Sequence, residues 1–239
     1  MKAVSFCFDD GFRASADKVR RIFGARQLSA AFCVLAAPEL TNDPYIRRSD
    51  VADWGYWRET LAEGHEVAPH GFAHEHLGRM SFNDACDSVQ RTLDVTEREL
   101  PAFNARKSVY HVAYVSAPVD VIRWIGQRSL GVRVATGGYG LNAWESLSQG
   151  GCVDCMAWGP QTCDEPARAH VDRFVQAPSG WLVVVFHGLD GEGWGTLSSA
   201  ALEGMLDQLL TAGIAVEPPN RVLGRFLSAR VQTRKGNLE

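Results

Sequence analysis

Short apolar runs alternate with helically periodic segments from one end of the chain to the other, and this alternation limits the possible folds most. Residues 4–8 are predicted as a buried strand, and residues 16–23 continue with apolar side chains at helical spacing. Further strands are predicted at residues 31–36, 65–68, 109–115, 132–135, 181–186 and 214–216. Strands and helices that alternate in this way are typical of α/β proteins with a parallel sheet.

The domain organisation follows from length and from the absence of a linker. No repeat, low-complexity run or Pro/Gly/Ser-rich segment divides the 239 residues. Single α/β barrels commonly have this length, so we expect one domain over residues 1–239. Residues 137–165 are rich in glycine and cysteine and have no clear period, which predicts an irregular loop or insertion there.

Composition excludes one large class of partners. Lysine and arginine number 24 against 28 acidic residues, and no basic stripe is present that would neutralise a phosphate backbone. Nucleic acid is therefore not expected as a partner.

The N-terminus and the cysteines bear on location. Asp9 and Asp10 come too early for a secretory apolar region, and no stretch approaches about 18 uninterrupted apolar residues. We therefore expect a cytoplasmic protein without a membrane segment and with its six cysteines reduced. A structural zinc site at Cys152 and Cys155 is an alternative, but the spacing to Cys163 and His170 is irregular, which favours free thiols.

Polar residues follow three of the predicted strands at the point where each strand ends. Asp9 and Asp10 follow the first strand, His70 and His74 follow residues 65–68, and His187 directly follows residues 181–186. Paired acids are common in turns and a His-x-x-x-His spacing is common on surfaces, so neither is specific alone. In a parallel α/β barrel, however, the carboxyl ends of the strands meet on one face, which predicts that the five residues converge.

The predicted cluster has the parts of a hydrolytic metal site. Two neutral imidazoles and one carboxylate leave coordination positions open, as catalytic zinc requires. The second carboxylate is then free to act as a base, and a histidine from another strand can act as the acid. Such a set is suited to metal-assisted hydrolysis of an amide or ester.

Three ordered segments carry these residues: residues 8–11 (FDDG), 64–74 (GHEVAPHGFAH) and 182–187 (LVVVFH). Together they resemble the motifs of the polysaccharide deacetylases with the NodB-homology domain, carbohydrate esterase family 4. The resemblance extends over nearly the whole chain and implies a distorted (β/α)7 barrel. It also implies Asp10, His70 and His74 as metal ligands, Asp9 as catalytic base and His187 as catalytic acid.

The resemblance further implies one divalent metal ion per active site. Zinc is the expected ion because imidazole with carboxylate suits it, and cobalt or nickel are expected to replace it.

One motif departs from the family pattern. Where the family commonly has Arg-Pro-Pro-Tyr, this chain has His111, Val112, Ala113 and Tyr114. His111 is therefore the candidate to replace the arginine that orients the base, with Tyr114 as the family tyrosine. A register shifted by two residues, with Val112 at the tyrosine position, remains open. The oxyanion donor of this motif is a backbone N–H, which a changed side chain need not abolish.

Two further positions are candidates for functional roles. The family's fourth motif, an aspartate that tunes the acid histidine, is not recognisable, and Asp154 with Trp158 is the one candidate for it. Trp194, in the glycine-rich loop after His187, is expected either to stack on a sugar ring or to anchor that loop.

The predicted function is a metal-dependent hydrolase that removes an acetyl group from an N-acetylated sugar, so that a carbohydrate is the expected substrate. The absence of an export signal favours small or carrier-linked sugars over extracellular polymers. The alternatives are hydrolysis of small cyclic or linear amides on the same fold, and a sugar-binding module without catalysis.

Overall fold

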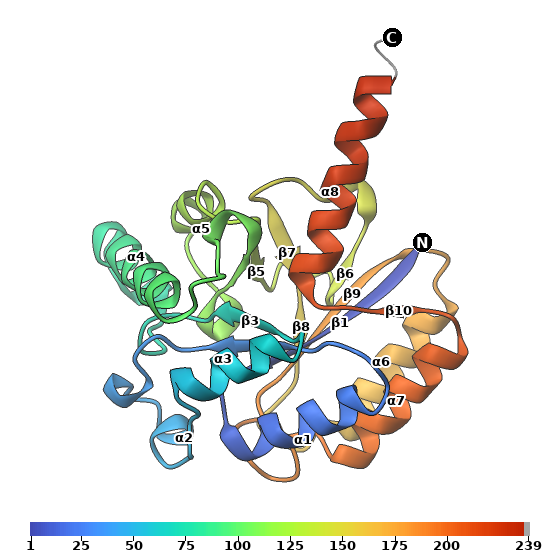
Figure 1. Ribbon diagram of the computed structural model, residues 1–239, viewed down its shortest axis with the longest axis horizontal. Helices are drawn as coiled ribbons and strands as arrows, with labels where there is room; N and C mark the ends of the chain where they lie inside the picture. The colour runs from blue at the N-terminus through green and yellow to red at the C-terminus, as the bar shows by residue number, and fades with distance from the viewer. Residues whose placement is uncertain (237–239) are drawn as a thin grey trace.

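The computed structural model describes residues 1–236 (Figure 1). Its strands are β1 (Lys2–Asp9), β2 (Ala31–Val34), β3 (Glu66–Pro69), β4 (Val109–His111), β5 (Gly131–Val134), β6 (Leu141–Asn142), β7 (Cys152–Asp154), β8 (Met156–Ala157), β9 (Gly180–Phe186) and β10 (Ala215–Val216). Its helices are α1 (Arg13–Gly24), α2 (Pro44–Arg47), α3 (Trp54–Ala62), α4 (Phe82–Glu99), α5 (Val119–Gly126), α6 (Asp164–Gln176), α7 (Ser199–Thr211) and α8 (Pro219–Gly236).

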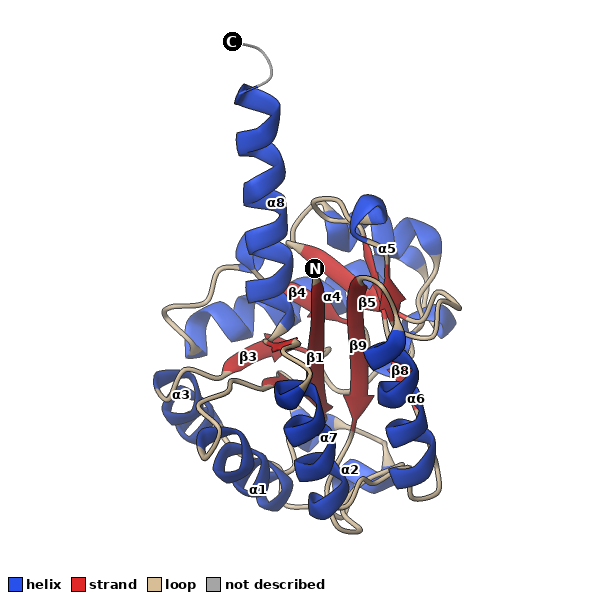
Figure 2. Cartoon of the chain, turned by 90° about the vertical axis from the view of Figure 1, so that its right-hand side faces the viewer, coloured by secondary structure: helices blue, strands red, loops and turns tan. Residues whose placement is uncertain are grey.

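Two mainly parallel sheets form the barrel. β1 pairs in parallel with β9, which lies beside it in Figure 2, and with β2, which pairs with β3. A second, three-stranded sheet has the order β4-β5-β7. The chain passes from β7 directly into β8, which pairs with β9, and this connection joins the two sheets. The result is the expected distorted (β/α)7 barrel.

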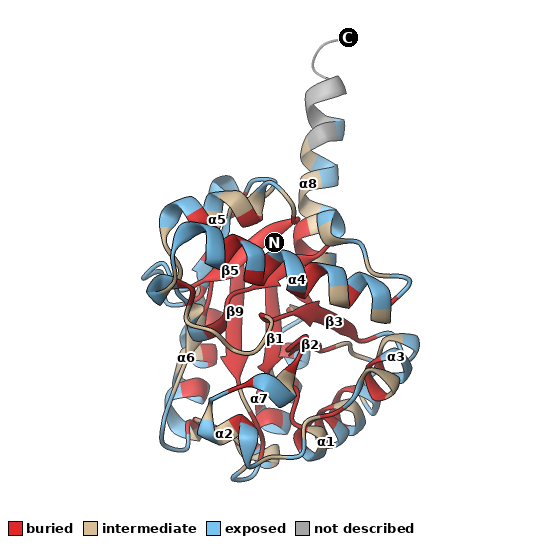
Figure 3. Cartoon of the chain, turned by 90° about the vertical axis from the view of Figure 1, so that its left-hand side faces the viewer, coloured by how far each residue is buried: buried red, intermediate tan, exposed pale blue. Residues whose placement is uncertain are grey.

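Side chains of the barrel strands alternate between the helices and the barrel interior, as period-two geometry requires. On β1, Phe6 and Phe8 pack outward with Phe23 of α1, whereas Cys7 points inward among Val183 and Val185 of β9. Figure 3 shows the buried strands inside a shell of helices whose outer faces are exposed. The barrel interior is thus packed and presents its functional groups at the strand ends.

Residues 137–165 are more regular than expected. The segment contributes β7 and β8, which complete the barrel, together with the short strand β6 beside β9. The expectation of an irregular insertion missed this strand because it is split into pieces of three and two residues, too short to show a period.

A seam separates β3 from β4, which lie next to each other but belong to different sheets. At the amino-terminal ends of the two strands, Asn220 of α8 bridges them. Its backbone N–H donates to Glu66 Oε2 at 2.9 Å, and its Oδ1 accepts from the backbone N–H of Val109 at 2.6 Å. The start of α8 therefore closes the amino-terminal end of the barrel.

No helix among residues 1–236 is long and apolar enough to cross a bilayer.

Glu66, at the amino-terminal end of the barrel, predicts that the free energy of unfolding depends on pH. Burial raises its pKa to about 8 from 4.5, although the Asn220 N–H acts in the opposite direction. Because the folded-state pKa is raised, this carboxyl contributes most stability below pH 4.5, and the contribution is lost as the pH rises toward 8. We expect Glu66→Gln to remove this loss, which amounts to roughly 3 kcal/mol between pH 5 and pH 8.

The measurement is the free energy of unfolding in urea at both pH values. The exposed Glu59 of α3 supplies the matched control, Glu59→Gln, whose pH dependence should equal that of the wild type. If the free energy of unfolding depended on pH equally in Glu66→Gln and in the wild type, burial would not raise the pKa of Glu66 as described.

Candidate active site

Five polar residues from three strand ends meet at the carboxyl face of the barrel. Asp9 ends β1 and Asp10 follows it, His70 follows β3, His74 lies in the next loop, and His187 follows β9. Asp9, Asp10, His74 and His187 line one cavity of about 440 Å³. His70 lies beneath it and is 1% exposed.

Asp10, His70 and His74 form a candidate metal-binding triad. Their ligand atoms lie within 4.8 Å of one another. Asp10 Oδ1 is 3.5 Å from His70 Nε2 and 3.4 Å from His74 Nε2. Asp10 Oδ1 and His70 Nε2 are buried and have no hydrogen-bond partner among the residues described. Buried polar atoms are rarely left in that state, so the donor set fits a cation.

The other nitrogen of each histidine is held by an oxygen. His70 Nδ1 lies 3.0 Å from the carbonyl oxygen of His111, and His74 Nδ1 lies 3.1 Å from Asp43 Oδ2. Both oxygens are acceptors, so each Nδ1 carries the proton and each Nε2 keeps its lone pair for a ligand. Asp43 was not found from the sequence, because nothing in its surroundings distinguishes it from a helix-capping aspartate.

Four of the residues that line the cavity have backbone angles that are unusual for a residue with a side chain. Asp10, His74, Tyr114 and Val115 have φ values of 73°, 62°, 57° and 49°. Positive φ costs free energy in residues other than glycine and is concentrated at functional sites. The surrounding structure holds these side chains toward the cavity at that cost.

Asp9 forms a buried, two-pronged ion pair with Arg133 of β5. Arg133 Nη1 donates to Oδ1 at 2.8 Å and Nη2 donates to Oδ2 at 2.7 Å. Burial by itself would raise the pKa of Asp9, but the charges of Arg133 and His70 outweigh it and hold the pKa well below its usual range. Asp9 is therefore ionised at neutral pH, as a general base must be.

Arg133, and not His111 as expected, is thus the residue that pairs with Asp9 and orients it. The His111 side chain is completely buried, and neither ring nitrogen has a hydrogen-bond partner among the described residues. His111 and Arg133 are directly paired neighbours on β4 and β5, so the arginine reaches the base from the next strand. The expectation failed because the family motif places the arginine on β4, whereas in this chain the arginine lies on β5. The arginine inside the apolar run 131–134 could have indicated a buried ion pair from the sequence, since a buried charge needs a partner.

His187 and Trp194 form one wall of the cavity. Their rings meet edge to face, with centroids 5.0 Å apart. Trp194 also covers Gly159, where a Cβ atom would come within 2.7 Å of its ring. Trp194 therefore anchors its loop and faces the cavity at the same time.

Asp154 does not serve as the partner of His187. Its Oδ1 accepts from the backbone and hydroxyl of Thr136, and its Oδ2 accepts from the Gly140 N–H at 2.6 Å. His187 Nδ1 has no hydrogen-bond partner within residues 1–236. The candidate match to the fourth motif is therefore wrong, because the Asp154 carboxylate is used to hold the loop after β5.

Two tyrosine side chains also line the cavity. Tyr45 and Tyr114 line the cavity, with Val115 and Ala157 completing it. Tyr114 is 45% exposed, and its ring packs on His74 with centroids 4.5 Å apart. The cavity, with His70 beneath it, thus combines three carboxylates, three histidines and an aromatic rim, a set that suits a hydrolase-type site on a barrel.

The comparisons with known proteins agree with this class. The family model described as polysaccharide deacetylase matches residues 1–148. The chain belongs to the polysaccharide deacetylase family. No match was found among curated proteins.

Solved structures of the same fold include proteins named as a deacetylase and as a pseudoenzyme. Peptidoglycan deacetylase PdaC from Bacillus subtilis is 17% identical, with 99% of this chain and 95% of that chain covered and a TM-score of 0.59. The CE4 domain of a xylanase from the hindgut metagenome of Trinervitermes trinervoides is 14% identical, with 94% and 90% covered and a TM-score of 0.56. A CE4 family pseudoenzyme from Bacillus anthracis is 14% identical, with 92% and 65% covered and a TM-score of 0.56.

Proposed function

We propose that this protein is a metal-dependent hydrolase that removes the acetyl group from an N-acetylated sugar. The observation that carries the proposal is the convergence of Asp9, Asp10, His70, His74 and His187 at one cavity with both ligand histidines oriented by oxygen acceptors. Membership of the polysaccharide deacetylase family supports it.

Asp10, His70 and His74 would hold the metal ion. One carboxylate and two imidazoles suit zinc, and cobalt or nickel are competent replacements. The ion, when bound, polarises the acetyl carbonyl and lowers the pKa of the attacking water.

The chain's own residues would move the protons. Asp9, kept ionised by Arg133, accepts the proton of the attacking water, and His187 of the same cavity donates a proton to the departing amine. In the register that places Tyr114 at the family tyrosine, its backbone N–H would hold the developing oxyanion. These roles require Asp9 deprotonated and His187 protonated at the start of turnover.

The aromatic rim favours a sugar as the group that carries the acetyl. Tyr45, Tyr114 and Trp194 offer flat apolar surfaces that suit the CH faces of a sugar ring. A small cyclic amide is the second candidate, since the cavity of about 440 Å³ is also large enough for such a molecule.

An acetate-release assay separates the candidates. Metal-reconstituted protein is incubated with N-acetylated sugars and oligosaccharides, O-acetylated sugars and small cyclic amides. We expect acetate from the N-acetylated sugars. Ring opening of a cyclic amide without acetate release would favour the second candidate, and no turnover of any substrate would indicate a sugar-binding protein without catalysis.

Asp43 predicts a measurable effect on metal affinity. Asp43→Ala removes the acceptor that orients His74, and such supporting groups contribute roughly 10–100-fold to affinity. We expect zinc titration of the metal-stripped protein to show a loss of that size. Asp43→Asn keeps an oxygen acceptor and the helix cap and should lose less, and Asp50→Ala, at an exposed position nearby, should lose nothing. Unchanged affinity in Asp43→Ala would contradict this role.

A further inference from the structure

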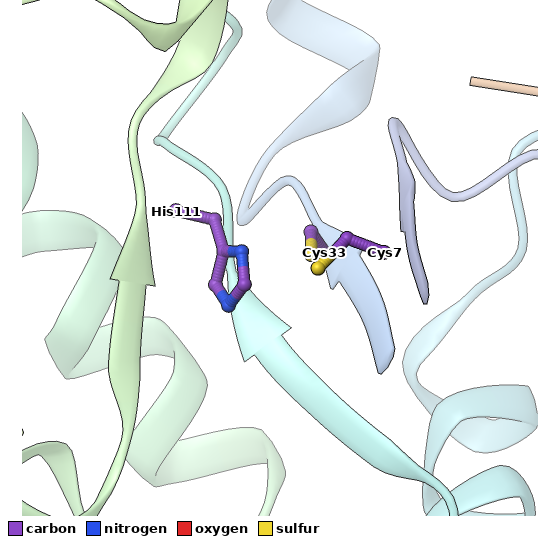
Figure 4. Close-up of side chains that lie close together, drawn as sticks. All are labelled: Cys7, Cys33 and His111. Atoms are coloured by element: carbon purple, nitrogen blue, oxygen red, sulfur yellow. The ribbon is translucent and has the colours of Figure 1, made fainter. Parts of the chain in front are cut away.

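A second group of metal-ligating side chains lies inside the barrel, apart from the triad. Cys7 of β1, Cys33 of β2 and His111 of β4 place two sulfur atoms and an imidazole nitrogen within 4.8 Å of one another (Figure 4). All three residues are 0% exposed. None of the three side chains lines the catalytic cavity or takes part in the proposed proton transfers.

The His111 ring is the strongest sign that this group has a ligand. Both ring nitrogens are buried without a hydrogen-bond partner in residues 1–236. A buried polar group in that state costs about 1–3 kcal/mol, so its retention calls for an explanation. The two cysteines are free thiols rather than a disulfide.

The donor set selects the class of ion. Two sulfurs and one imidazole suit zinc and similar thiophilic ions, whereas magnesium and calcium require oxygen ligands. Two thiolates also balance the charge of a divalent ion, so a loaded site adds no net charge to the interior. The neighbouring Asp9–Arg133 pair is already neutral.

The position of the group gives the ion a structural purpose. Cys7 and Cys33 belong to the larger sheet and His111 belongs to the three-stranded sheet, so an ion here would join the two sheets. This link would lie at the carboxyl end of β4, whereas Asn220 bridges the amino ends of β3 and β4. It would also fix His111, whose carbonyl oxygen orients the ligand His70.

We propose that Cys7, Cys33 and His111 form a second, structural metal site for a thiophilic divalent ion, zinc above all, which links the two sheets within the barrel. Because the site is completely buried, the ion enters as the chain folds. The site is independent of the catalytic reaction and would be retained even in a chain without deacetylase activity.

Cobalt substitution tests the site directly. The full chain is unfolded, refolded with Co²⁺ under reducing conditions and examined by absorption spectroscopy. Sulfur ligands give cobalt a near-ultraviolet charge-transfer band, which the Asp/His/His triad cannot produce because it contains no sulfur. We expect the band in the wild type, in Asp10→Ala and in the control Cys86→Ser, whose cysteine lies on α4 outside the group. We expect it to be absent from the double variant Cys7→Ser/Cys33→Ser.

X-ray absorption of zinc-refolded Asp10→Ala gives a second test that needs no cysteine variant, in case the double variant does not fold. We expect sulfur at about 2.3 Å from the zinc. Absence of the cobalt band from the folded wild type, its persistence in the folded double variant, or zinc without sulfur neighbours in Asp10→Ala would each overturn the proposal. Neither test depends on acetate release, so a negative deacetylase assay would not change the results expected from them.

Discussion

Asparagine in place of Asp9 is expected to lower kcat by roughly 10²–10⁴-fold, the usual contribution of a positioned general base, while the catalytic metal stays bound. The substitution keeps the shape of the side chain and removes the proton acceptor. It also leaves the buried Arg133 without its counter-charge, so turnover is measured at a temperature where circular dichroism shows the variant folded.

The neighbouring acid supplies the matched variant. Asp10→Ala should lose activity and bind about one zinc ion fewer per chain than the wild type, because two neutral imidazoles alone hold a dication poorly. Metal loss in Asp9→Asn with metal retention in Asp10→Ala would show that the two roles are reversed. Full activity in both variants would place the active site elsewhere.

Replacement of Arg133 by methionine is expected to destabilise the protein by about 3–5 kcal/mol. Arg133 is 0% exposed and pairs with the buried carboxylate of Asp9, so its removal leaves an uncompensated charge in the core. The pKa of Asp9 should rise at the same time, which moves the acidic limb of the pH–rate profile to higher pH.

A double-mutant cycle separates the ion pair from simple packing. Asp9→Asn combined with Arg133→Met removes both charges, so the double variant should be more stable than the sum of the single effects predicts. The exposed Arg123→Met is the control and should change the free energy of unfolding by less than about 0.5 kcal/mol. Strict additivity of the two single effects would contradict a coupled pair.

The parts of the molecule that the sequence predicted share one property, which is that a continuous apolar run marks the strand before them. Such runs precede Asp9 and His187, so both strands and the residues at their ends could be predicted. β7 and β8 are too short to show a period, and their role in closing the barrel depends on pairing with distant β5 and β9.

The supporting residues could not be predicted in the same way, because they act across strands. Arg133 reaches Asp9 over 124 positions of sequence, and Asp43 reaches His74 from a separate loop. The grouping of Cys7 and Cys33 with His111 likewise depends on the relative level of β1, β2 and β4. Such contacts depend on strand order and register, which local patterns do not encode.

Zinc addition to the metal-stripped wild type, followed by acetate release from an N-acetylated oligosaccharide, tests the central claim most directly. We expect no acetate from the stripped protein, and release that rises with added zinc and saturates when about one ion per chain has bound at the triad of Asp10, His70 and His74. The same addition to Asp10→Ala should restore nothing. Zinc that binds at the triad without any acetate release, or acetate release that does not depend on zinc, cobalt or nickel, would contradict a metal-dependent deacetylase.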